Sequence, residues 1–290
     1  MTDAASTPPQ LANSGFNLRG LAIHACLILG ALVMIYPLLW LASSSLKPSN
    51  LIFSDLSLWP ARIRLENYVD GWRGAALPFS TFFLNSFVIA GLAVVGNVLA
   101  CSLVAYAFAR LNFSFKKTLF ALMMLTIMIP LHATLIPQYA LFHNLGWVNT
   151  ILPLVVPKFL AVDAFFIFLM IQFIRGIPRE LDEAATIDGA GPFRIYWSII
   201  LPLLTPALVT TAVFSFIWTY EDFLSPLVYL TSMDNYTVPQ GLSLLMASKG
   251  ASSWGPLLAM SLLSLVPLFV VFFIFQRRLI EGIATTGLKG

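Results

Sequence analysis

Long apolar stretches dominate this sequence and restrict it to a membrane environment. A membrane-spanning helix needs about 20 mostly apolar residues. Six segments meet this length, at about 20–43, 82–109, 118–138, 151–174, 199–220 and 256–276. Only 10% of the 290 residues are charged, whereas soluble domains carry roughly 25%. Because lipid leaves backbone groups no external hydrogen-bond partner, the sequence predicts an all-α integral membrane protein with six transmembrane helices.

Several classes of function have no support in the sequence. The net charge of +3 comes without a basic patch interleaved with aromatic residues, so no nucleic-acid binding is predicted. Cys26 and Cys101 fall inside apolar stretches and are interpreted as small apolar side chains. His24, His132 and His143 lack metal-ligand spacing. With no metal site and no legible catalytic arrangement, we expect a non-enzymatic membrane protein.

The charge distribution predicts the orientation of the chain. The first apolar run is longer than the core of a signal peptide and is interpreted as a retained anchor. With six helices, residues 1–19 and 277–290 form two tails on one side of the transmembrane domain at 20–276. Ten Lys and Arg residues fall on that side and six on the other. The positive-inside rule therefore places both termini in the cytoplasm, with the domain in the cell inner membrane.

A polar segment at 175–198 interrupts the apolar pattern between the fourth and fifth predicted helices. Pro178 is well placed to open a short helix, and acidic residues in the first turns suit the positive end of the helix dipole. Gly189 and Gly191 are expected to end this helix, and Pro192 prevents its continuation. The sequence thus predicts a short cytoplasmic helix with acidic residues at its start, held between two membrane helices.

The residues of this segment closely resemble the motif of binding-protein-dependent ABC importer permeases. Glu183-Ala184-Ala185 is followed by Gly189 and then by Ile199-Ile-Leu-Pro202. The form Ile187-Asp-Gly-Ala190 is typical of the carbohydrate-uptake branch, which contains the maltose-type inner permease subunits. Asn85-Ser86, the run Ala105-Tyr-Ala-Phe-Ala-Arg110 and the C-terminal Gln276-Arg-Arg278 agree with the same family. One departure is Trp218-Thr-Tyr-Glu-Asp-Phe223, because family members usually carry Trp-Asn-Asp/Glu-Phe there.

The resemblance implies that the short helix is a coupling helix, which inserts into a cleft of a cytoplasmic ATPase subunit. The residues expected to serve this contact are Glu180, Glu183, Ala184, Ala185, Asp188, Gly189, Gly191 and Pro202. This sequence has no phosphate-binding loop, so ATP and Mg would be used by the partner ATPase dimer and this chain would bind no cofactor. The other implied partners are a second, homologous permease subunit, an extracytoplasmic solute-binding protein and membrane lipid.

Polar and aromatic residues at membrane depth are candidates for the substrate pathway, because ionisable groups there are costly. Lys158 and Asp163 lie in the fourth predicted helix and can pair with each other or with a partner subunit. Trp218, Tyr220, Glu221 and Asp222 lie where the fifth predicted helix ends. Aromatic rings stack on sugar C–H faces and carboxylates accept hydroxyl hydrogens, although an outer surface cluster remains the alternative.

Together these features predict half of the translocation pathway of an ABC importer. The expected cargo is a sugar: an oligosaccharide, disaccharide, amino sugar or polyol derivative. An ABC importer for a non-sugar solute is the main alternative. An ion-coupled secondary carrier is a further alternative, but it would have no need of the Glu-Ala-Ala segment.

Overall fold

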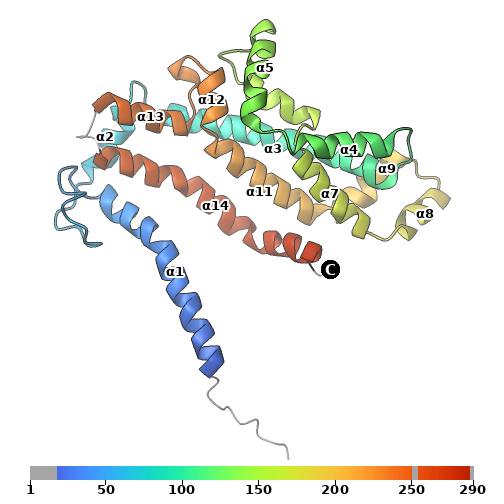
Figure 1. The fold of residues 1–290 in the computed structure, drawn as a ribbon, viewed down its shortest axis with the longest axis horizontal. Coiled ribbons are helices and arrows are strands. Elements are labelled where there is room, and N and C mark those ends of the chain that lie inside the picture. The colour runs from blue at the N-terminus through green and yellow to red at the C-terminus, as the bar shows by residue number, and fades with distance from the viewer. Residues whose placement is uncertain (1–17, 250–253, 288–290) are drawn as a thin grey trace, which may run out of the picture.

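The computed structural model describes residues 18–249 and 254–287, and every regular element in these ranges is helical. A long central helix, α3 (Phe79–Arg110), packs against α11 (Thr205–Glu221) and α7 (Ala164–Gly176). The last helix, α14 (Trp254–Gly287), packs against α11, against α2 (Glu66–Gly74) and against the end of α1 (Leu18–Ser45). Figure 1 shows α3, α11 and α14 running lengthwise through the bundle.

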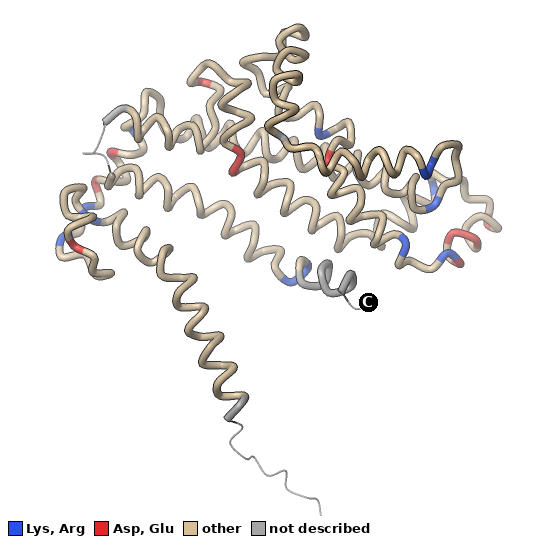
Figure 2. The backbone as a smooth tube through the Cα atoms, in the orientation of Figure 1, with Lys and Arg blue, Asp and Glu red and all other residues tan. Residues whose placement is uncertain are grey.

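The helix lengths confirm an integral membrane protein. Four helical stretches among the described residues are long and apolar enough to cross a membrane: Gly20–Ser45, Phe79–Arg110, Leu152–Gly176 and Trp254–Leu279. A fifth is formed if Pro192–Leu203 and Thr205–Glu221, which meet at 75°, make one bent span. Figure 2 shows that many charged residues lie toward the two ends of the bundle, with a few red and blue positions between them.

The third predicted span, at 118–138, differs from one continuous helix. The structure forms α4 (Lys116–Thr126) and α5 (Leu131–Asn144) instead. Pro130, with extended backbone, directly precedes α5. Proline disfavours helical geometry in the residue before it, which explains a break that the apolar composition alone conceals.

The fourth and fifth predicted spans are also interrupted. The fourth consists of α6 (Leu152–Val155), the 3-10 turn η1 (Val156–Leu160) and α7, with the left-handed Ala161 between η1 and α7. The fifth begins earlier than the predicted residue 199, at α9 (Pro192–Ile195), and continues through the π-helix η2 (Tyr196–Ile200) and α10 (Leu201–Leu203). The chain then bends into α11.

Two segments that are distant in the sequence are joined by hydrogen bonds. They are residues 147–150 and the stretch between α12 (Leu224–Tyr229) and α13 (Val238–Lys249), which contains the short turn η3 (Met233–Asn235). The Oδ1 atom of Asn149 accepts hydrogen bonds from the backbone N–H groups of Thr231 and Ser232, at 3.0 and 2.8 Å. Asn85 donates to the carbonyls of Asp234 and Tyr236. These contacts fix the long connection between α11 and α13.

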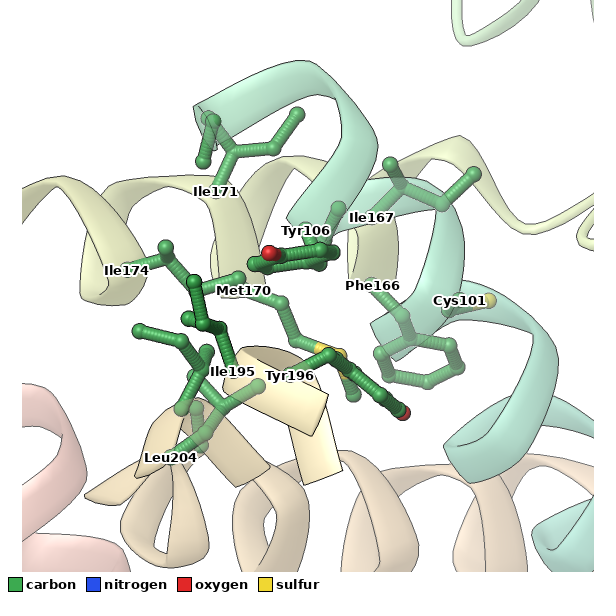
Figure 3. Close-up of a cluster of buried hydrophobic side chains, with 14 residues drawn as sticks. Cys101, Tyr106, Phe166, Ile167, Met170, Ile171, Ile174, Ile195, Tyr196 and Leu204 are labelled. Carbon is green, nitrogen blue, oxygen red and sulfur yellow. The ribbon is translucent and has the colours of Figure 1, made fainter. Parts of the chain in front are cut away.

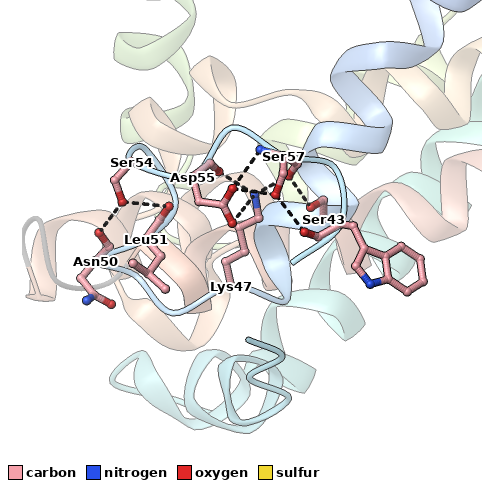
Figure 4. A network of polar contacts seen from close by, with 8 residues as sticks. Ser43, Lys47, Asn50, Leu51, Ser54, Asp55 and Ser57 are labelled. Carbon is pink, nitrogen blue, oxygen red and sulfur yellow. Dashed lines mark hydrogen bonds and ion pairs between the residues drawn. The ribbon is translucent and has the colours of Figure 1, made fainter. Parts of the chain in front are cut away.

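A buried lysine organises the connection between α1 and α2. Lys47 is 1% exposed and donates to the carbonyls of Asp55 and Ser57 at 2.7 and 2.6 Å (Figure 4). The Asp55 carboxylate lies 3.7 Å from the Lys47 ammonium and accepts hydrogen bonds from Ser57. These hydrogen bonds, followed by the charge of Lys47, lower the pKa of Asp55. Because buried ammonium groups must be paired, the loop closes around Lys47 in a defined shape.

Candidate functional site

The short helix α8 (Glu180–Ile187) lies at one end of the molecule, opposite to α2 and α13 (Figure 1). In Figure 2 its acidic residues form a red group beyond the ends of the long helices. Glu180, Glu183, Ala184 and Asp188 are exposed, and Ile187 is 87% exposed. Ala185, in contrast, packs against the core. The helix therefore has an inner face on the bundle and an outer face of carboxylates, alanine and isoleucine.

Local chemistry sets both ends of α8. Glu180, Asp182 and Glu183 occupy its first turn, where negative charge stabilises a helix. At the other end Gly189 has a φ of +81°. The Ala190 N–H donates to Ala185 and the Gly189 N–H donates to Thr186, which is the Schellman arrangement. The helix end expected at Gly189 is thus present, while Gly191 lies just beyond it as the extended residue before α9.

The inner face of α8 is tied to the end of α3. Arg110, which is 5% exposed, lies with its Nε 2.9 Å from the Asp182 carboxylate. Its Nη2 donates to the Ile177 carbonyl, just before α8, at 2.7 Å. After α8 in the sequence, the Pro192 carbonyl accepts a hydrogen bond of 2.9 Å from the Tyr106 hydroxyl. Neither Arg110 nor Tyr106 is among the residues predicted for this site, although both lie in the run 105–110.

Three cations that precede α8 in the sequence, Lys116, Arg175 and Arg179, lie near one another. The Lys116 ammonium donates to the Leu111 carbonyl at 2.7 Å. The Lys116 ammonium is close enough to Arg179 and Arg175 for their charges to interact. The Arg175 guanidinium lies 6.0 Å from the centre of the Phe120 ring, within the range of cation–π attraction. Basic residues thus lie at the same end of the bundle as the acidic residues of α8 (Figure 2).

The segment after α8 continues into the core through aromatic packing. Tyr196 is buried against Tyr106, with ring centroids 5.3 Å apart, beside Met170 and Phe166 of α7 (Figure 3). Pro202, a candidate residue, is exposed near the bend that separates α10 from α11. Pro206 has no N–H to give to the Pro202 carbonyl, and the Thr205 hydroxyl donates to that carbonyl instead, at 2.6 Å.

The candidate pathway residues Lys158 and Asp163 form an ion pair. Their charged groups are 2.9 Å apart, and each side chain is 27% exposed. The pair bridges the interruption at Ala161, so its two residues come together where the helix is broken. Gly96, near the middle of α3, lies against the backbone of Lys158 and the ring of Phe159. Beside it, Asn97 donates to the Ser215 hydroxyl of α11 at 2.9 Å.

The other four pathway candidates do not form one site. Trp218 is 49% exposed and stacks on Phe166, with centroids 5.2 Å apart, and it also contacts Phe165. Tyr220 is buried against Phe216 and Phe87, away from that exposed face.

The two carboxylates that follow Tyr220 differ in their surroundings. Asp222 is half-buried and accepts the Ser225 N–H at 3.1 Å, at the start of α12. Glu221 is exposed. Trp218 therefore remains the strongest candidate of this group, beside the Lys158–Asp163 pair at the start of α7.

Comparisons with known proteins agree with this architecture. Residues 96–284 match the family described as the binding-protein-dependent transport system inner membrane component. The diacetylchitobiose uptake system permease protein NgcG of Streptomyces coelicolor is 30% identical over 90% of this chain and 86% of its own length. The arabinooligosaccharides transport system permease protein AraQ of Halalkalibacterium halodurans is 35% identical over 90% and 93%.

A third relative and a solved structure extend the comparison. The sn-glycerol-3-phosphate transport system permease protein UgpE of Yersinia pestis is 32% identical over 92% of this chain and 97% of its own. A bacterial ABC transporter involved in importing the acidic polysaccharide alginate has a chain of the same fold, with a TM-score of 0.78. That chain is 21% identical, and the match covers 93% of this chain and 99% of that one. The protein belongs to the binding-protein-dependent transport system inner membrane component family and is a non-catalytic permease subunit of an ABC importer.

Proposed function

We propose that this chain forms half of the translocation pathway of a sugar importer and is driven through α8 by a separate ATPase. The observation that carries the proposal is the shape of α8. It is a short helix with an exposed Glu183-Ala184 face, anchored by its opposite face to the bundle. Exposed small side chains let a partner groove approach closely, and exposed carboxylates supply charge for pairing with basic residues. Glu180, Asp188 and Gly189 would complete this contact.

The proposed topology has six spans with both termini in the cytoplasm. In this arrangement α4 and α5 together form the third span, broken at Pro130, and Pro192–Glu221 forms the bent fifth. Broken spans are tolerated where protein or water satisfies the freed backbone, as Thr205 does beside Pro202. The α8 end would then be cytoplasmic, and the end bearing α2 and α13 would face outward toward a solute-binding protein.

A second permease subunit and lipid would complete the membrane assembly. The apolar part of α1 has none of its residues buried in this chain, and Figure 1 shows the helix leaving the bundle. Trp218 and the Lys158–Asp163 pair are partly exposed at membrane depth. In water such exposure would be ordinary, but in a bilayer it favours contact with another subunit or a water-filled path. We assign these residues to the pathway between the two permeases.

A sugar is the proposed cargo, because permeases named for diacetylchitobiose and arabinooligosaccharides are among the relatives. The exposed indole of Trp218 supplies a flat surface for a sugar ring. A relative named for sn-glycerol-3-phosphate supports the second candidate, a non-sugar solute. Binding of sugars and of glycerol 3-phosphate to the cognate solute-binding protein separates the two: sugar binding supports the proposal, and exclusive binding of the phosphate ester contradicts it.

Coupling through α8 is tested by reversing one exposed charge. We expect Glu183→Lys to reduce solute-dependent ATP hydrolysis and uptake at least tenfold in the reconstituted importer, while membrane insertion stays normal. Asp234→Lys, at an exposed position near η3, is the matched control. Normal uptake by the Glu183 variant would contradict ATPase coupling at this helix and would favour an ion-coupled carrier.

A further inference from the structure

Three side chains on one face of α3 hold the segment that contains α8. Ser102, Tyr106 and Arg110 are spaced four residues apart, so they lie along a single stripe of the helix. Ser102 and Tyr106 are buried, at 0% and 6% exposure, and the side chain of Arg110 is 5% exposed. We call Ser102, Tyr106 and Arg110 the α3 stripe.

Each residue of the α3 stripe contacts a different part of the 177–196 segment. Arg110 binds the Ile177 carbonyl before α8 and pairs with Asp182 within it. Tyr106 donates to the Pro192 carbonyl after α8. Ser102 and Tyr196 share a hydrogen bond of 2.8 Å between their hydroxyls. The segment is thus fixed to one helix before, within and after α8.

These contacts are short. The Ser102–Tyr196 hydrogen bond is buried, those of Tyr106 and Arg110 to backbone carbonyls are partly buried, and the Arg110–Asp182 contact is an ion pair. A charge-assisted contact in a low-dielectric setting is stronger than a neutral one in water. Breaking it leaves an unpaired buried group, which is costly. A displacement of α8 would therefore carry the end of α3 with it and would not be absorbed in the flanking loops.

The other part of α3 reaches the candidate pathway. Gly96 and Arg110 are 14 positions apart, which is about 20 Å along a helix. At Gly96 the helix lies against Lys158, and at Asn97 it is hydrogen-bonded to Ser215 of α11. One continuous helix therefore joins the base of α8 to the Lys158–Asp163 pair.

We propose that the α3 stripe is the transmission element of this importer, with Arg110 and Asp182 as positioning residues that make α3 move with α8. This inference rests on the proposed function, because it requires α8 to be the part moved by the ATPase. The contacts of the stripe lie on the inner side of α8, so their loss leaves the outer Glu183-Ala184 face available to the ATPase.

The test measures ATP hydrolysed per solute transported in the reconstituted importer, with co-purification of all subunits as the readout of assembly. We expect Arg110→Gln and Asp182→Asn to assemble normally but to raise this ratio at least fivefold. Tyr106→Phe, which removes one hydroxyl, should raise it about twofold. Lys117→Gln is the matched control, because Lys117 is an exposed cation of α4 that belongs neither to the α3 stripe nor to α8.

A charge exchange separates positioning from simple destabilisation. Arg110→Asp combined with Asp182→Arg should restore at least part of the coupling that Arg110→Asp alone abolishes. An unchanged ratio in both Arg110→Gln and Asp182→Asn would overturn the proposal, and so would loss of assembly in all three stripe-contact variants. Failure of the coupling role of α8 itself is distinguished by Glu183→Lys, which would then transport normally.

Discussion

Gly96 lies directly against Phe159: a Cβ atom on Gly96 would come within 2.8 Å of the Phe159 ring and within 3.0 Å of the Lys158 backbone. The absent side chain lets α3 approach the interrupted fourth span where the Lys158–Asp163 pair lies. Small residues serve this purpose widely in membrane proteins, where close packing stabilises helix association.

Gly96→Ala should therefore destabilise the protein. Overpacking of this kind costs about 1–3 kcal/mol, and we expect a lower midpoint of thermal unfolding in detergent. Gly91→Ala in the same helix is the control, because a Cβ atom at Gly91 would meet no heavy atom within 4 Å. Equal stability of the two variants would show that α3 does not pack closely at Gly96.

Asn149 should govern the order of the connection between α11 and α13. Its side-chain oxygen accepts hydrogen bonds from the backbone N–H groups of Thr231 and Ser232. Its φ of +65° is a backbone angle that asparagine tolerates better than alanine. Asn149→Ala should cost about 1–3 kcal/mol of local stability, seen as faster hydrogen exchange at the Thr231 and Ser232 amides. Asn144→Ala, at an exposed position, should leave that exchange unchanged. Equal exchange in both variants would argue against the role of Asn149.

The ion pair of Lys158 and Asp163 should behave as a coupled unit. Asp163→Leu leaves the lysine unpaired at membrane depth, and we expect a loss of about 1–3 kcal/mol after allowing for its partial exposure. Lys158→Met combined with Asp163→Leu should recover most of the thermal stability. If the pair belongs to the pathway, uptake stays reduced in this double variant, and full recovery of uptake would make the pair purely structural.

Trp218→Ala should reduce uptake by removing the exposed indole that we assign to the pathway. We expect at least a fivefold loss of uptake, with assembly unchanged. Trp197→Ala is the control, since Trp197 is similarly exposed at 55% but lies in η2 near the α8 end. Equal uptake by the two variants would remove Trp218 from the pathway.

The parts of this molecule that depend on local chemistry are predictable from the sequence. The end of α8 at Gly189 is predictable because glycine tolerates a positive φ. For Lys158 and Asp163 the sequence predicts pairing with each other or with a partner subunit, and the structure shows the first. The interruption at Pro130 is not predicted from apolar composition, because composition indicates the length of a span but not whether its helix is continuous. The same holds for the bend near Leu204, although Pro202 and Pro206 flank it.

Long-range polar contacts cannot be predicted from local sequence. In the local sequence Arg110 is recognisable only as the last residue of the run 105–110, and its partner Asp182 lies 72 positions away. The spacing of Ser102, Tyr106 and Arg110 is a usable signal, because side chains four positions apart lie on one face of a helix. Nothing in the local sequence indicates that Asn149 meets Ser232.

Site-specific cross-linking of α8 tests the central claim most directly. In a background of Cys26→Ser and Cys101→Ser, Ala184→Cys lies on the exposed face and Ala185→Cys on the face that packs against the core. With a short thiol-reactive cross-linker, we predict that Ala184→Cys captures the partner ATPase in the assembled importer and that Ala185→Cys does so at least fivefold less. Equal capture at both positions, or no capture of the ATPase at Ala184→Cys in an assembled complex, would contradict coupling through the outer face of α8.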